Sequence, residues 1–358
     1  MLAFLFTFFF SLQRLLPAAP EKPLVLQAAP FPVANPLFSV GAVRDERPGR
    51  PAVAWLLTPT SATVQPVELQ GGTEAALRQF AARSLPAASA RYRVAIRVLE
   101  CRVQEVPTAN RQAAGQLTVR LAFDWQNPEG RTHTLTEYRS GARYQRPLTD
   151  RTAVEAALQQ NLQGAFGYLQ QWLTKAVQQD ARLATAVRPT FSYDTHQTEQ
   201  DTVFYDPNRP LSWNDFTGTP RSKGKYAAAV YSSFAYQGWP RLNNGVIDLN
   251  IRLKVFMVRS SSWVAPEQRT AYNLNHEQRH FDIVRLVVER FRRKASPDSL
   301  TVDDFNSILG WQYLKSFTEM NHLQDQYDQE THGGIDAAAQ ERWNRRIDAE
   351  LRGYGVLR

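Results

Sequence analysis

Cysteine is almost absent from this chain of 358 residues, because Cys101 is the only one. A single cysteine excludes an intramolecular disulfide bond. Cys101 lies in a segment that alternates like a strand, far from the N-terminus, so it cannot be a lipid-anchored N-terminal cysteine. The sequence therefore predicts a buried, unreactive thiol at this position.

The chain also lacks any block of five or six basic residues, although its net charge is +8. A scattered excess of arginine is typical of a solvated basic surface. No nucleic-acid-binding motif and no aromatic ladder between basic residues accompany it, so a nucleic-acid partner is not expected. The positive charge remains compatible with peripheral association with the cell envelope.

No apolar run is long enough to span a bilayer comfortably. The longest, Leu2–Leu12, is followed by the small and proline residues Pro17–Pro20, which suits the core of a signal peptide. Residues 1–20 are therefore interpreted as a signal-peptide-like segment, and the protein as exported to the periplasm or the extracellular space. No Lys or Arg precedes the run, and a short membrane anchor is the alternative.

The length favours two domains. Residues 30–188 predict an α+β accessory domain, in which an antiparallel sheet carries its helices on one face. Its expected elements are a helix capped by Thr73, strands at Tyr92–Val103, Leu117–Trp125 and Thr132–Ser140, and a helix starting at Asp150. Catalytic residue types do not cluster here, so the role of this domain is left open.

A polar stretch near residue 190 predicts the boundary to a second domain, residues 195–358. Its clearest strand, Ile247–Met257, alternates apolar residues on one face with polar residues on the other. A strand with one solvated face could lie at the rim of a cleft, where an edge strand could hold an extended peptide. An ordinary half-buried strand is the alternative.

Histidine is also scarce, with six residues in the chain, yet two of them stand four apart in the segment His276–His280. On a helix this spacing places both imidazoles on one face, one turn apart, where they can bind one Zn²⁺ ion. Glu277, between them, is then placed to act as general base on a water bound to the zinc.

The flanking sequence predicts a helix from Pro266 to Ser296. Apolar residues recur at three- and four-residue steps along it, and both histidines lie on that stripe. The opposite face is expected to be solvated, and it carries Arg279, Arg285, Glu289, Arg292 and Arg293. Two interpretations of the histidine pair need no metal: the helix lies on the surface, or both histidines are hydrogen-bonded in the core.

A catalytic zinc site needs a third protein ligand. The next predicted helix, from about Val302 to Gln329, ends in three candidates: Asp328, Glu330 and His332. Tyr327 is a candidate donor to a developing oxyanion. Asp336 is expected to cap a final helix that closes at Gly353.

The C-terminal half resembles a bacterial family of uncharacterised proteins described as predicted secreted zinc-dependent proteases. The matching pieces are residues 211–216, 262–263, 274–283, 327–331, Gln340 and Trp343. The resemblance implies a zincin-like fold, with His276 and His280 as zinc ligands and Glu277 as the base. The family often has a histidine directly before the glycine that aligns with Gly334. Here that position is Gly333 and the histidine is His332, so the third ligand stays open.

The sequence thus predicts an exported zinc metallohydrolase, a peptidase acting on peptide or protein substrates through Glu277 and a zinc-activated water. The alternative is a non-catalytic envelope protein, in which the zincin-like domain binds a partner or serves a structural role.

Overall fold

A computed structural model describes residues 21–59, 61–86, 90–195, 201–220 and 227–357. The predicted signal-peptide-like segment, residues 1–20, lies outside them. The chain divides into two compact units, the first made of Met1–Gln126 and Thr132–Thr174 and the second of Asn127–Arg131 and Lys175–Arg358. This division falls before the predicted boundary near residue 190, because the strand Val187–Tyr193 pairs within the sheet of the second unit.

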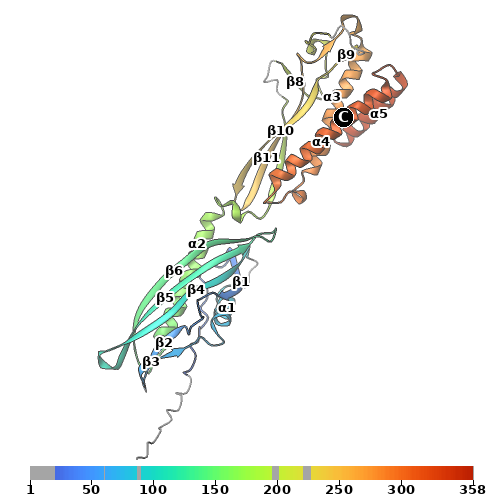
Figure 1. Ribbon diagram of the computed structural model, residues 1–358. Coiled ribbons are helices and arrows are strands. Elements are labelled where there is room, and N and C mark those ends of the chain that lie inside the picture. Colours follow the sequence, from blue (N-terminus) through green and yellow to red (C-terminus); the bar gives the residue numbers. More distant parts are fainter. Residues whose placement is uncertain (1–20, 60, 87–89, 196–200, 221–226, 358) are drawn as a thin grey trace, which may run out of the picture. The chain divides into compact units, whose positions relative to one another are not determined.

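The first unit combines one sheet with two helices (Figure 1). Its strands are β1 Phe38–Asp45, β2 Ala54–Thr58, β3 Ser61–Val67, β4 Tyr92–Thr108, β5 Gln112–Gln126 and β6 Thr132–Pro147, and its helices are α1 Thr73–Ser84 and α2 Thr152–Ala176. The strand order is β3-β2-β4-β5-β6, with β1 also pairing with β4. The α+β class is confirmed.

Two details of the predicted first domain are wrong. The sheet is mixed rather than antiparallel, since β1 and β2 both run parallel to β4 and α1 lies on the connection that such a crossover requires. Thr73 is the first residue of α1 and does not cap it. Its hydroxyl instead accepts a hydrogen bond from Arg47 and donates one to Glu68.

The described residues of the second unit form a four-stranded sheet, a two-stranded sheet and three α-helices. Its elements are β7 Val187–Tyr193, β8 Thr202–Phe204, β9 Ala228–Ala229, β10 Ser232–Asn243, β11 Val246–Val258, β12 Trp263–Val264, α3 Ala271–Lys294, α4 Phe305–Thr331 and α5 Ala337–Gly353. The predicted alternation of β11 is confirmed, because its apolar residues are buried. It is not an edge strand: β10 pairs along one side of it, and β7 and β8 pair along the other.

Helix α3 contacts β10 and β11 and also both other helices (Figure 1). It begins at Ala271 rather than Pro266, because Pro266–Gln268 forms a separate 3₁₀ turn and the Thr270 hydroxyl accepts from the Asn273 amide. Arg285 and Glu289 were predicted to be solvated, but both are buried. They form an ion pair that packs against Tyr193 of β7. This pairing explains why the two charged side chains can be buried.

In the part of the chain that the structure describes, no helix has the length and apolar character needed to cross a membrane.

Candidate metal centre

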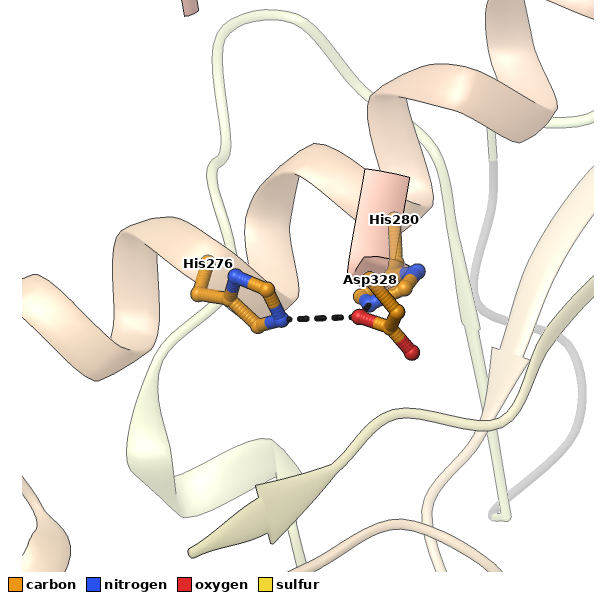
Figure 2. Close-up of side chains that lie close together, drawn as sticks. All are labelled: His276, His280 and Asp328. Carbon is orange, nitrogen blue, oxygen red and sulfur yellow. Dashed lines mark hydrogen bonds and ion pairs between the residues drawn. The ribbon is translucent and has the colours of Figure 1, made fainter. Parts of the chain in front are cut away.

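Two helices bring three potential metal ligands together. His276 and His280 project from α3, one turn apart, and Asp328 projects from the last turn of α4 (Figure 2). One carboxylate oxygen of Asp328, Oδ1, lies 3.2 Å from Nε2 of His276 and 3.0 Å from Nε2 of His280. The three ligating atoms all lie within 4.8 Å of one another, which is close enough for a single ion.

The three candidates for the third ligand have different positions. Asp328 lies beside the two histidines, whereas the exposed Glu330 accepts hydrogen bonds from Trp343 and Gln326. His332 is exposed and ends α4 in the left-handed conformation, with φ of 52°. The structure therefore brings Asp328 to the histidine pair and leaves the other two candidates outside the cluster.

The electrostatics of the cluster favour an ionised Asp328. Burial opposes its ionisation, but the contacts with the imidazoles of His276 and His280 hold the pKa of this carboxyl well below its ordinary value. Burial alone would lower the pKa of His280, yet the hydrogen bond and charge of Asp328 raise it. An anionic oxygen between two imidazoles is a donor set that suits a divalent cation.

Glu277 lines a cleft together with His276, His280 and Asp328, and its side chain is buried. Its Oε2 accepts a hydrogen bond of 2.8 Å from the backbone amide of Val230, just after β9. Among the residues that the structure describes, none donates to its other oxygen, Oε1. Burial raises the pKa of Glu277, although the neighbouring His280 and His276 act in the opposite direction. A raised pKa suits a carboxylate that takes up a proton near neutral pH.

The cleft has a volume of about 580 Å³ and is lined largely by polar groups. Its wall on α4 comprises Asn321, Gln324, Asp325 and Asp328, in which each of the two middle residues lies three or four positions from both end residues, on one face of the helix. This polar stripe was not singled out from the sequence, although its helical spacing was visible there. The opposite wall is the backbone of Ala228, Ala229 and Val230, for which the sequence held no indication.

Tyr327 packs against the ligands rather than lining the cleft. Its ring stacks on His276 with a centroid separation of 4.7 Å and meets His280 edge-on at 5.0 Å. The side chain is fully buried and burial raises its pKa. Its hydroxyl has no hydrogen-bond partner within the described part of the chain.

Comparison with known proteins gives little further information. No family model and no curated protein matches the chain. A crystal structure of a Xanthomonas campestris protein of family DUF330 matches with 16% identity and a TM-score of 0.30, over 46% of this chain and 99% of its own. A second, uncharacterised protein matches with 11% identity and a TM-score of 0.23, over 42% and 98%. Likenesses this weak support no inference about fold or function.

Proposed function

We propose that the second unit is a zinc-dependent peptidase with a zincin-like active site, in which His276, His280 and Asp328 hold the ion. The observation that carries the proposal is the meeting of two imidazole nitrogens and one carboxylate oxygen beside a buried glutamate at an open cleft. Two histidines and a carboxylate form a recurring ligand set of catalytic zinc, which keeps one position free. A zinc ion held there would polarise a scissile carbonyl and acidify a bound water.

Glu277 is the proposed general base. The Val230 amide fixes one of its oxygens, so the other is held in a defined direction. With a pKa raised by burial, this carboxylate takes the proton from the attacking water and passes it to the leaving amine.

The backbone of β9 supports a peptide as the substrate. Ala229 pairs with Trp263 of β12, and the carbonyl of Ala227 accepts from Ala265, so residues 227 and 229 direct their polar groups toward β12. Because these groups alternate along a strand, those of Ala228 and Val230 point the other way, toward Glu277 and the cleft. Since the Val230 amide already donates to Glu277, an extended peptide would pair with the other backbone groups of this edge, beside the proposed metal ligands.

The test is a comparison of Glu277→Gln with the parent protein. We expect the variant to retain one zinc ion per chain, because Glu277 is not a ligand, and to lose peptide hydrolysis by about 10²- to 10⁴-fold. Zinc is measured by elemental analysis of the metal-replete protein, and hydrolysis with a quenched fluorescent peptide library. Glu330→Gln is the control, since this exposed carboxylate lies outside the cleft. Undiminished hydrolysis by Glu277→Gln would contradict the mechanism.

The alternative, a non-catalytic envelope protein, is motivated by the first unit. No group of three potential metal ligands occurs in its described residues. Absence of stoichiometric zinc from the parent protein, or zinc without hydrolysis of any peptide, would favour this alternative. Export remains a proposal that rests on the apolar segment Leu2–Leu12.

A further inference from the structure

His276 makes a second hydrogen bond on the side of its ring that faces away from Asp328. Its Nδ1 lies 3.1 Å from Oε1 of Gln340, which α5 supplies from 64 residues further along the chain. Figure 2 shows one ring nitrogen of His276 directed at Asp328 and the other directed away from it. Gln340 is only 1% exposed, so water does not compete for this contact.

The surroundings of Gln340 determine which end of its amide faces His276. Its Nε2 lies 3.1 Å from Oδ1 of Asn275 and 3.5 Å from the backbone oxygen of Tyr272. Two acceptors on that side require the amide nitrogen there, which leaves Oε1 to face the imidazole. An oxygen facing Nδ1 requires a proton on Nδ1, and in the neutral ring Nε2 then carries the lone pair.

That lone pair points at Oδ1 of Asp328, 3.2 Å away. Two electron-rich atoms at this separation repel each other unless a positive charge, from a proton or a metal ion, is shared between them. The hydrogen bond that Nδ1 donates to Gln340, on the opposite side of the ring, thus prepares Nε2 as a metal ligand.

Packing prevents the ring from turning over. The Tyr327 ring stacks on one face of His276 with an interplanar angle of 21°. The backbone of Gly334, at φ of +86°, approaches so closely that a Cβ at this position would lie 3.2 Å from Nδ1 of His276. The absence of a side chain at Gly334 leaves the room in which Gln340 reaches the imidazole.

We propose that Gln340 is a positioning residue, which holds His276 in the Nδ1-protonated tautomer so that Nε2 is presented to the metal. This inference rests on the proposed zinc site and assigns a function to α5, which provides no ligand. Outer hydrogen bonds of this kind typically contribute about 10- to 100-fold to metal affinity.

The experiment compares Gln340→Met, which keeps the size of the side chain but removes the acceptor, with Gln340→Glu, which keeps an acceptor. Zinc affinity is measured on the full chain by competition with a chromophoric chelator. We expect a loss of about 10- to 100-fold for Gln340→Met and a smaller loss for Gln340→Glu, whose second oxygen meets the acceptors of Asn275 and Tyr272. The thermal midpoint of each zinc-free protein reports whether the fold is intact.

A second measurement reads the tautomer itself. In proteins labelled with ¹⁵N-histidine, a two-bond proton–nitrogen spectrum distinguishes protonated Nδ1 from protonated Nε2. The parent is expected to show His276 protonated at Nδ1 with and without zinc, and Gln340→Met to show a mixture of tautomers without it.

Equal zinc affinities in the parent and Gln340→Met would overturn the assignment. Equal losses in both variants would overturn it too, because packing rather than the acceptor would then matter. A parent protein that binds no zinc contradicts the proposed function instead, and the spectrum of the zinc-free protein still tests the tautomer independently.

Discussion

At the scale of single residues, Tyr327 combines full burial with a hydroxyl that lacks a partner in the described part of the protein. A buried hydroxyl without a hydrogen bond costs about 1–3 kcal/mol. Tyr327→Phe should therefore leave the free energy of unfolding unchanged or raise it by about 1 kcal/mol, as measured by urea denaturation.

The same variant tests the catalytic function that the sequence suggested for Tyr327. Removal of an oxyanion donor typically lowers kcat by about 10²–10³. Because the ring packs on His276 and does not line the cleft, we expect peptide hydrolysis by Tyr327→Phe to equal that of the parent. A lower kcat with an unchanged free energy of unfolding would instead support the predicted function of Tyr327 as an oxyanion donor.

Part of the candidate site could be derived from residue spacing. His276, Glu277 and His280 lie on one helix, so their geometry follows from the four-residue step alone. Asp328 could not be chosen over Glu330 and His332, because the choice depends on how α4 crosses α3 and on where α4 ends. The orientation of Gln340 depends on Asn275 and Tyr272, and no sequence pattern predicts that these residues contact Gln340.

At the scale of elements, Gly334 in the turn between α4 and α5 lies against the ring of His276, a proposed metal ligand. Gly334→Ala forces a side chain onto a backbone of φ +86° and toward the His276 ring. We expect it to lower the free energy of unfolding by about 1–2 kcal/mol and also to weaken zinc binding. Urea denaturation and chelator competition measure the two effects.

Gly310, in the second turn of α4, is the matched control. A Cβ there would meet no atom within 4 Å, and the backbone has no positive φ. Gly310→Ala should stabilise the protein by about 0.5–1 kcal/mol, because alanine loses less conformational freedom in a helix, and leave zinc affinity unchanged. Zinc affinities that stay equal in the two variants would contradict the contact between Gly334 and His276.

Element type was easier to derive from the sequence than element pairing. The helix predicted after Asp150 and the alternation along β11 are both observed, because each depends only on local periodicity. The direction of β1 and β2 and the central position of β11 were missed, since they depend on partners distant in the chain. The predicted exposure of Arg285 and Glu289 was wrong for the same reason, because helix periodicity does not reveal that β7 packs against this face of α3.

At the scale of the whole molecule, the chain divides into two compact units, and we expect each to be stabilised by its own buried contacts. In the first, Arg146 and Glu105 form a fully buried ion pair, and Arg146 also donates to backbone oxygens of Leu57, Pro147 and Leu148. Arg146→Met would leave the Glu105 charge uncompensated and should lower the free energy of unfolding by about 3–5 kcal/mol.

The proposed metal centre lies in the second unit, so the zinc affinity of Arg146→Met should equal that of the parent at a temperature where both proteins are folded. Arg120→Met is the control, because its ion pair with Glu137 is exposed and typically contributes at most about 1 kcal/mol. Calorimetry and chelator competition provide the readouts. A parallel loss of zinc binding in Arg146→Met would show that the two units do not behave independently.

The proposed ligands His280 and Asp328 are 48 residues apart and belong to different helices. An ion between them would therefore cross-link α3 to α4 in the folded state only. By mass action, free zinc at 100 times its dissociation constant would add about 2.7 kcal/mol to the stability of that state. Zinc supply would then determine how much of the protein survives degradation, so that scarcity of the metal would reduce the amount of the protein as well as its activity.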